Sequence, residues 1–165
     1  MIDFFHKGAS MTKKVTGIAK IEGAPEVESR PAVKITETAT FYNEEDKITS
    51  ILLEVANTEE KRKRGLMGRK SLPPICGMLF TGLSGPGHFW MKDCLIPLDV
   101  MFMNTKATVT KTYSMPVDKD GSKHYNYDED DVAAIEVPHG FCSKWGIKKG
   151  TRVELSKLSG GGDED

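Results

Sequence analysis

A cation, two acids and a thiol lie close together in the stretch FWMKDCLIPLD, residues 89–99. Lys92 and Asp93 directly precede Cys94, and Asp99 ends the stretch. A nearby cation lowers the pKa of a thiol, and a thiolate is a nucleophile, so this order of residues would suit covalent catalysis. However, a lone cysteine beside apolar residues is more often a small buried side chain, and no partner base can be read from the sequence. The stretch is therefore interpreted as core with charged neighbours, and no catalytic residue is predicted.

Other residue types that support chemistry are dispersed along the chain. The histidines lack metal-binding spacings, and the many methionines between residues 67 and 115 are interpreted as core fillers rather than Cu(I) ligands. The acidic run at residues 128–131 is interpreted as a solvated loop, because no glutamate closes a calcium loop of the expected length. No glycine-rich phosphate loop connects a strand to a helix. The sequence predicts neither a cofactor nor a metal site.

The overall charge of the chain is nearly balanced. Among its 165 residues are 23 basic and 24 acidic side chains, so the basic surface that binds nucleic acid is not expected. No apolar run is long enough to cross a bilayer, and no membrane partner is expected. Cys76, Cys94 and Cys142 are odd in number and widely separated, which indicates free thiols in a reducing compartment. A soluble, cytoplasmic protein is predicted.

Composition divides the chain into an arm, one domain and a tail. Residues 1–46 have too few clustered apolar side chains for a core of their own, so an extended, partner-dependent arm is predicted. Val33, Ile35 and the threonines that follow have strand periodicity, so part of the arm is expected to be β and to join a sheet edge of its own domain or of a neighbour. Residues 47–157 are predicted to form the domain, and residues 158–165 a flexible acidic tail.

Short apolar runs separated by Gly, Pro and Asn turns predict strands throughout the domain. The predicted strands are residues 48–56, 78–80, 89–91, 100–103, 107–113, 132–137 and 152–155. Asn57 or Thr58 is expected to cap a short helix that ends at Gly65, and residues 141–145 are expected to form a helical turn. The predicted fold class is mainly β, a β-rich α+β domain. It consists of a single compact antiparallel sheet or barrel with one or two short helices.

Three stretches carry a family resemblance: VANTEEKRKRGLMGRKSLPPICGMLF, FWMKDCLIPLDVMFM and AAIEVPHGFCSKWGIKKGTRVEL. In order and spacing they resemble the bacterial, archaeal and phage family called domain of unknown function 192, over roughly residues 51–155. The resemblance implies a small, mostly β domain with short helices, and no established activity. The family pattern falls on Glu60, Arg62, Gly65, Leu66, Met67, Arg69, residues 77–80, 89–93 and 97–99, and Glu136.

The chain departs from that family pattern at several positions. Cys94 stands where the family commonly has threonine, which argues against a hydroxyl-dependent reaction there. Thr151 replaces a common aspartate, and His139 and Cys142 occupy positions often filled by small residues.

The charged residues of the family pattern adjoin apolar runs. Because desolvating an unpaired ion costs several kcal/mol, Arg–carboxylate pairs are expected at the edge of the core, where they would fix strand order. In the functional alternative, charged and aromatic members of the set line one pocket for a small or extended ligand. That predicted pocket contains Arg62, Arg69, Trp90, Lys92 and Asp99. The full set of candidate ligand- or partner-binding residues is Arg62, Arg69, Trp90, Met91, Lys92, Asp93, Asp99 and Glu136.

Two functional hypotheses follow. The first is a non-catalytic binding or assembly module whose arm, residues 1–46, orders against neighbouring subunits in a homo- or hetero-oligomer. Such a subunit could decorate or cement a phage virion. The alternative is a small-ligand-binding protein or a hydrolytic enzyme that uses the Arg/Lys/Asp pocket.

Overall fold

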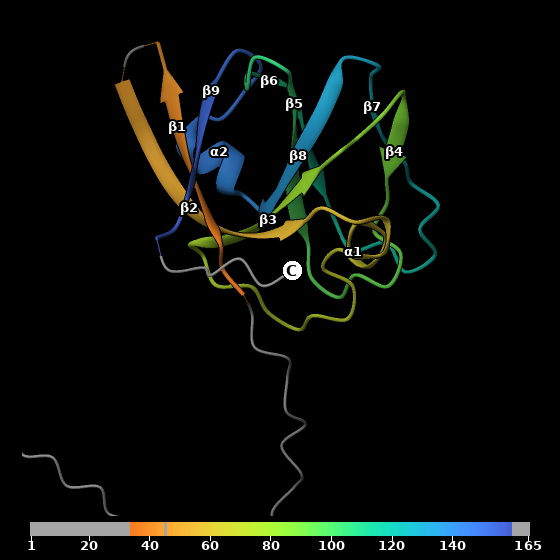
Figure 1. Cartoon of the computed structure of the whole chain (residues 1–165). Coiled ribbons are helices and arrows are strands. Elements are labelled where there is room, and N and C mark those ends of the chain that lie inside the picture. Colours follow the sequence, from red (N-terminus) through yellow and green to blue (C-terminus); the bar gives the residue numbers. More distant parts are fainter. Residues whose placement is uncertain (1–33, 45, 160–165) are drawn as a thin grey trace, which may run out of the picture. The chain divides into compact units, whose positions relative to one another are not determined.

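A computed structural model describes residues 34–44 and 46–159 of the chain, which form nine strands and two short helices (Figure 1). The predicted arm residues 1–33 and most of the predicted tail lie outside the described residues. The elements are β1 (Glu37–Asn43), β2 (Asp46–Ala56), α1 (Glu59–Arg64), β3 (Cys76–Thr81), β4 (Gly87–Phe89), β5 (Leu98–Asn104), β6 (Val109–Met115), β7 (Tyr125–Tyr127), β8 (Asp131–Pro138), α2 (Phe141–Trp145) and β9 (Arg152–Lys157).

Seven of the strands form one sheet in the order β6-β5-β8-β3-β2-β1-β9, and β4 pairs with β7. The predicted mainly β class with two short helices is confirmed. The large sheet is mixed, however, because β2 and β3 run parallel while its other neighbours are antiparallel. A parallel pair requires a crossover, which residues 57–75 supply with α1. A bridge between Thr108 and Arg152 joins the outer edges at one end, and the sheet is not closed into a barrel.

Local signals define helix α1. The Thr58 hydroxyl accepts a hydrogen bond from the Lys61 amide at 3.2 Å, which caps the helix N-terminus. Gly65 follows the last turn with φ of 48°, and its amide donates to the Lys61 carbonyl at 2.9 Å. The cap and the stop predicted from the sequence are confirmed. No residue of α1 is buried, so its position depends on the segments that flank it.

Strand β1 comes from the predicted arm but lies inside the sheet. β1 falls within residues 1–46, yet it pairs with β2 on one side and with β9 on the other. Its Ala39 and Phe41 are 0% exposed and pack in the core. The strand periodicity of this segment therefore serves its own domain.

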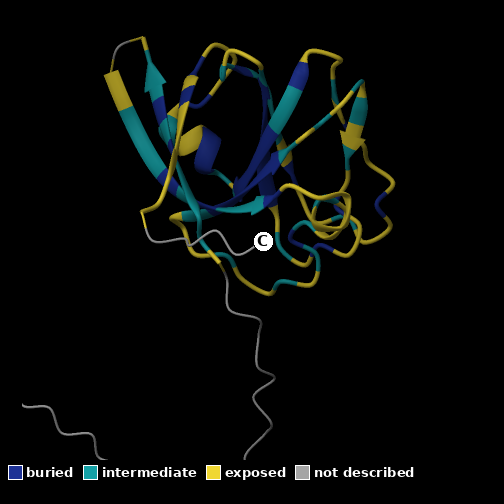
Figure 2. Cartoon of the chain, in the orientation of Figure 1, coloured by how far each residue is buried: buried dark blue, intermediate teal, exposed yellow. Residues whose placement is uncertain are grey.

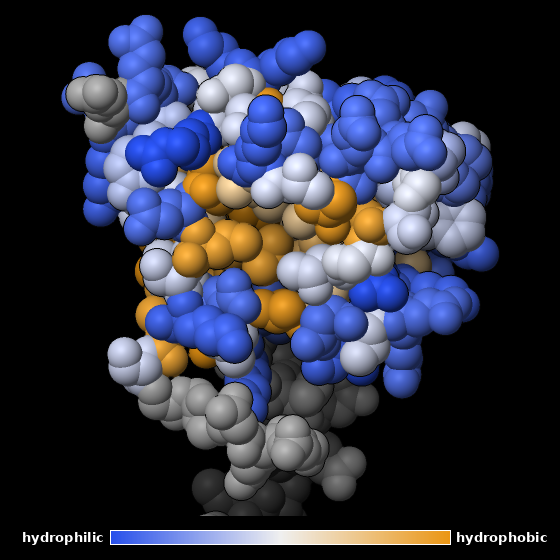
Figure 3. All heavy atoms as spheres, turned by 45° about the horizontal axis from the view of Figure 1, so that its top comes forward, coloured by the Kyte–Doolittle hydropathy of each residue, from blue (hydrophilic) through white to orange (hydrophobic). Residues whose placement is uncertain are grey.

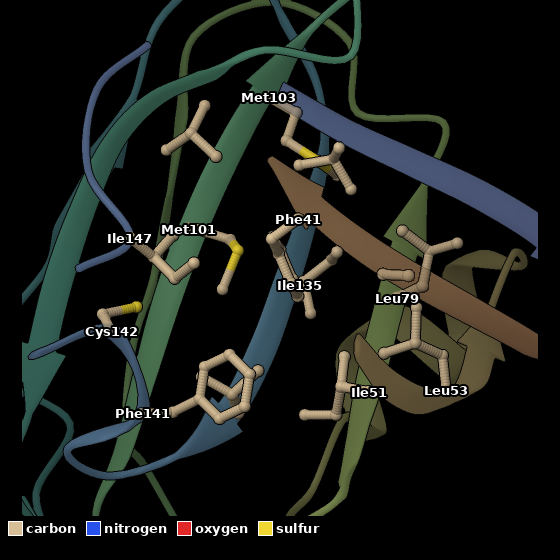
Figure 4. Packing of buried hydrophobic residues seen from close by; sticks show 14 residues of the cluster. Phe41, Ile51, Leu53, Leu79, Met101, Met103, Ile135, Phe141, Cys142 and Ile147 are labelled. Carbon is tan, nitrogen blue, oxygen red and sulfur yellow. The ribbon is translucent and has the colours of Figure 1, made fainter. Parts of the chain in front are cut away.

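Two apolar clusters lie on opposite faces of the sheet. The first contains Phe41, Ile51, Leu79, Met101 and other inward-pointing side chains, and α2 contributes to it (Figure 4). Strands alternate between the faces, so the neighbours of these residues face the second cluster, which includes Leu66, Met78, Phe80, Met91, Cys94, Val100, Phe102 and Ala134. β5 is buried on both faces, and Figure 2 shows buried residues along it and along much of β8.

Some element boundaries differ from the predictions. The strand expected at residues 89–91 stops at Phe89, because the Cys94 amide donates to the Met91 carbonyl at 3.0 Å and closes a tight turn. Asp93, the residue before Cys94, has φ of 60°. The strand expected to begin at Ala107 begins at Val109, since Ala107 also has positive φ and lies in the preceding turn. β7 was not predicted, because three residues are too short for a clear alternation.

Candidate functional site

A pocket of about 330 Å³ lies between α1, the second face of the sheet and the β4–β7 pair. Its apolar lining residues are Leu66, Met67, Phe80, Leu83, Phe89, Trp90, Cys94 and Tyr127. Its polar and charged lining residues are Glu59, Arg62, Lys63, Arg64, His88 and Glu136. An apolar cavity of this size with a few charged groups has the character of a small-molecule site.

Glu136 is the buried acid of this pocket. It lies in β8, on the same face as Ala134 of the second cluster, and is only 4% exposed. No described residue forms an ion pair or a side-chain hydrogen bond with its carboxyl group. Burial without a compensating charge raises the pKa of Glu136 to about 8. The side chain is therefore mostly a neutral carboxylic acid at pH 7.

The backbone beneath Glu136 is closely packed against β3. A Cβ atom on Gly77 would lie 2.5 Å from the Glu136 carbonyl oxygen, so only glycine fits at that position. This close contact keeps the Glu136 backbone of β8 against the paired strand β3.

Basic side chains of α1 line another side of the pocket. Arg62 donates from Nη1 to the Thr81 carbonyl at 2.9 Å, which ties α1 to the end of β3. Lys63 and Glu59 form an exposed pair at 2.8 Å, and Arg64 is also exposed. With three cations and one acid, this side of the pocket favours anions over cations.

Aromatic rings form much of the remaining lining. Phe80 and Phe89 meet edge-to-face at 4.9 Å between centroids, and Phe89 meets Tyr127 at 6.0 Å. A Cβ atom on Gly87 would lie 2.3 Å from the Tyr127 hydroxyl, so this glycine makes room for the tyrosine ring. The arrangement provides flat apolar surfaces suited to a ring.

Trp90 extends this aromatic surface to solvent. It is 42% exposed and meets His88 edge-to-face at 6.2 Å, and His88 in turn stacks on His124 at 3.9 Å. The Lys92 ammonium lies 5.5 Å from the centroid of the Trp90 ring. Lys92 therefore contacts the outer side of this aromatic group and does not line the pocket.

The structure brings together only part of the predicted site. Arg62, Trp90 and Glu136 line one pocket. The remaining candidates, Arg69, Met91, Lys92, Asp93 and Asp99, are not among its lining residues. Met91 is fully buried in the second cluster, and the Asp93 carbonyl accepts a hydrogen bond from the Gly68 amide at 2.9 Å.

Arg69 forms the kind of ion pair expected at the core edge. Its Nη1 and Nη2 atoms donate to the two carboxylate oxygens of Glu54 at 2.5 and 2.8 Å. Both side chains are largely shielded, at 27% and 12% exposure. This bidentate pair attaches the segment after α1 to β2, so its role is structural.

Replacing Arg69 with alanine is expected to destabilise the domain by about 2 kcal/mol, because Glu54 is left shielded without its partner. Denaturant unfolding followed by circular dichroism measures the loss. Lys63→Ala is the matched control, since it breaks an ion pair whose side chains are 75% and 77% exposed, and no measurable change is expected. Equal losses in the two variants would contradict a structural role for the Arg69 pair.

Asp99 is the centre of a separate polar network on the other face of the sheet. Its Oδ2 atom accepts from the amides of Gly140 and Cys142 at 3.0 and 3.1 Å, at the start of α2. Its Oδ1 atom accepts from the Ser114 hydroxyl at 3.1 Å and lies 3.3 Å from His139 Nδ1. Asp99 is 3% exposed, and these contacts supply hydrogen-bond partners to its buried carboxyl group.

The same network has the residue types of a hydrolytic triad but not its geometry. The Ser114 hydroxyl and the Asp99 carboxylate both approach Nδ1 of His139, the hydroxyl at 3.1 Å. In a triad, the nucleophile and the acid contact different nitrogens of the imidazole, so that a proton can pass through the ring. The described geometry therefore supports a structural role for Asp99.

The thiols of the domain are held in their protonated form. Burial, together with the nearby charges of Glu136 and Asp93, raises the pKa of Cys94 to about 11. Burial, with Asp99 close by, raises the pKa of Cys142 to about 12. Lys92 does not offset these effects at Cys94, and a thiolate nucleophile is not supported there.

Apart from Arg62 and Trp90, the aromatic and α1 residues of the pocket were not predicted from the sequence. Tyr127 and His88 were missed because the pairing of β4 with β7 joins residues far apart in the sequence. The alternation of Tyr125 and Tyr127 is the one signal that could have indicated this strand. Among the described residues, no three His, Cys, Asp or Glu side chains gather in a way that could hold a metal ion.

The fold and the pocket define a small β-rich domain with an internal carboxylic acid. The chain belongs to the DUF192 family, described as "Uncharacterized ACR", whose profile matches residues 40–155. The resemblance identified from the sequence is therefore confirmed. The match begins within β1, consistent with that strand being part of the domain.

Two solved structures have similar folds. One is described as a proposed transcription regulator from Sinorhizobium meliloti 1021, with 25% identity and a TM-score of 0.68, covering 73% of this chain and 93% of that one. The other is a protein of unknown function from Novosphingobium aromaticivorans DSM 12444, with 26% identity and a TM-score of 0.68, covering 84% of this chain and 98% of that one. No curated protein matches the chain significantly. Neither helix of the described residues has the length and apolarity needed to cross a membrane.

Proposed function

We propose that this domain binds a small ligand in the pocket between α1 and the sheet. The observation that supports the proposal is Glu136, a carboxyl group that is 4% exposed, lacks a partner among the described residues and lines the pocket. An unpaired buried carboxyl group destabilises a folded protein, and a well-packed apolar side chain of similar volume would not. A bound ligand can supply the missing hydrogen-bond partner.

The rest of the pocket suits this role better than catalysis. A perturbed acid in a cleft is a common feature of functional sites, but hydrolysis also requires a nucleophile or an activated water. Cys94 lines the pocket as a protonated thiol, and the Ser114–His139–Asp99 network lies elsewhere. Binding without chemical conversion is the function that this set of residues supports.

Screening a fragment library by ¹H–¹⁵N NMR tests the proposal. Compounds that bind should shift the amides of α1 and of residues 88–90 together, because these segments line one pocket. Trp90→Ala should weaken binding by about tenfold, since it removes an aromatic wall. Leu155→Ala is the matched control: Leu155 is 38% exposed, close to the 42% of Trp90, but does not line the pocket, and binding should not change. If no fragment shifts the pocket amides, the proposal is wrong.

An assembly role through the N-terminal arm is a second proposal. One observation favours it: within the described residues, the outer edge of β9 pairs only near its start, through the Thr108–Arg152 bridge. An edge strand with free backbone groups can accept a strand from a neighbouring chain, and Leu155 and Leu158 are exposed beside it. Incorporation into a virion would be one form of such assembly and stays a prediction.

Apolar side chains are also exposed elsewhere on the domain. Figure 3 shows apolar atoms gathered in the middle of one face, between hydrophilic side chains. The large exposed apolar residues of the described segments are Ile75, Trp90, Leu95, Val117, Leu155 and Leu158. These exposed apolar side chains are available for contact with a protein partner.

A further inference from the structure

We propose that Glu136 recognises its ligand as a neutral carboxylic acid, and that the ligand is an aromatic or other flat ring bearing a primary carboxamide or a lactam. This inference rests on the proposed ligand-binding function and specifies the class of ligand. It draws on three features of the pocket: the isolation of Glu136, the distribution of charge along the lining, and the aromatic walls.

The surroundings of Glu136 provide no cation that would ionise it. From the strands beside β8, the facing residues are Met78 of β3 and Val100 of β5, which are buried and apolar. The titratable or charged groups among the pocket residues are Glu59, Arg62, Lys63, Arg64, His88, Cys94 and Tyr127. None of them forms an ion pair or a hydrogen bond with the Glu136 carboxyl group, and the pKa of about 8 follows from burial alone.

A neutral carboxylic acid has a specific hydrogen-bonding pattern. One oxygen carries an O–H donor, and the other is an acceptor beside it. A primary carboxamide or a lactam presents an N–H donor and a carbonyl acceptor with the same spacing, so the two groups satisfy each other in a pair of parallel hydrogen bonds. An alcohol or an ether can form only part of this pattern.

Charge along the pocket argues against the two ionic alternatives. An ammonium ligand would ionise Glu136 but would share the pocket with Arg62, Lys63 and Arg64. A carboxylate placed against the neutral Glu136 would bury a negative charge in an apolar environment. A neutral group at Glu136 avoids both costs, and Phe80, Phe89 and Tyr127 offer flat surfaces to the ring that bears it.

Three ring-matched probes distinguish these alternatives: benzamide, benzylamine and benzoate. Dissociation constants are measured by NMR titration of the full chain at about pH 6.5, below the Glu136 pKa of about 8. Benzamide is expected to bind about tenfold tighter than the other two, because only benzamide completes both hydrogen bonds without a buried charge. Its affinity should fall by about tenfold per unit above pH 8, as Glu136 loses its donor proton.

Variants of Glu136 provide a second test of the inference. Glu136→Gln keeps a donor and an acceptor but cannot ionise, so benzamide binding should weaken by less than about tenfold and lose its pH dependence. Glu136→Leu removes both groups and should weaken benzamide binding by more than about tenfold. The ¹³C shift of the Glu136 carboxyl carbon, followed in the wild-type chain, should show a titration midpoint near pH 8.

Several results would overturn the inference. Tighter binding of benzylamine or benzoate at the pocket would reject the neutral acid while leaving the ligand-binding proposal intact. A titration midpoint of the Glu136 carboxyl group below about pH 6 would also reject the neutral acid. The same conclusion would follow if Glu136→Gln lost as much benzamide binding as Glu136→Leu. Failure of the whole fragment library to shift pocket amides is the separate result that rejects the binding function itself.

Discussion

Removal of residues 1–33 is expected to leave the domain folded, whereas removal of residues 1–46 is expected to abolish folding. The longer deletion takes away β1, an inner strand that pairs with both β2 and β9. It also removes Phe41, which is fully buried and meets Phe141 edge-to-face at 5.9 Å. Loss of one buried phenylalanine side chain alone costs about 3–5 kcal/mol, a large part of the total stability of an ordinary domain.

Circular dichroism and denaturant unfolding of the two truncated chains measure this difference. Phe41→Ala in the full chain should lower the free energy of unfolding by about 3–5 kcal/mol. Val117→Ala, at an apolar side chain that is 42% exposed, is the control, and stability is expected to stay nearly the same. A stable, cooperatively folding chain without residues 1–46 would contradict the place of β1 in the sheet.

The shorter deletion also tests the proposed assembly role. Because it spares β1, any change in particle size can be assigned to residues 1–33 rather than to loss of the fold. Sedimentation of the full chain and of the chain without residues 1–33 should show a large assembly only for the full chain. Identical particle sizes for the two folded proteins would reject an assembly role for that segment.

The second large effect concerns the dependence of stability on pH. The free energy of unfolding of the wild-type domain is expected to fall by about 3 kcal/mol, relative to Glu136→Gln, between about pH 4.5 and pH 7. In the unfolded chain Glu136 ionises near pH 4.5, whereas in the folded domain it keeps its proton up to about pH 8. The folded state therefore binds more protons in this window, and raising the pH favours the unfolded state.

Denaturant unfolding of the wild type and of Glu136→Gln across this pH range measures the effect. The difference between the two should grow with pH and level off above about pH 8, where both states of the wild type are ionised. Glu129→Gln, at an exposed acid, is the control, and its curve should follow that of the wild type. If Glu136→Gln also follows the wild type throughout, Glu136 is not held neutral by burial.

Local signals in the sequence predicted much of the fold. Thr58 and Gly65 mark the ends of α1, because caps and stops depend on residues within one turn of the helix. β1 was assigned to the arm, because the sparse apolar content of residues 1–46 as a whole outweighed the alternation of a few residues. The parallel pairing of β2 with β3 was missed, since strand direction depends on the path of the crossover.

The candidate site was predicted less well, and the reason is also physical. A charge beside an apolar run can be paired, solvated or buried alone, and the partner is set by tertiary contacts. Arg69 pairs with Glu54 across the crossover, and Asp99 accepts hydrogen bonds from residues about forty positions later in the chain. Among the buried acids of the described residues, Glu136 alone lacks a hydrogen-bond partner, and nothing in the sequence distinguishes it from Asp99.

The crossover between the parallel strands β2 and β3 contains α1, which forms one wall of the pocket. This crossover can open locally while the sheet stays folded. Helix α1 buries no residue, and the segment after it is held by Leu66 in the second cluster, the Arg69–Glu54 pair and the Gly68 amide. Detaching this segment costs less than unfolding the sheet, so its amides should exchange hydrogen through local opening. A ligand that bridges α1 and Glu136 raises the cost of that opening. Slower exchange along the crossover then reports pocket occupancy, without requiring that the identity of the ligand be known.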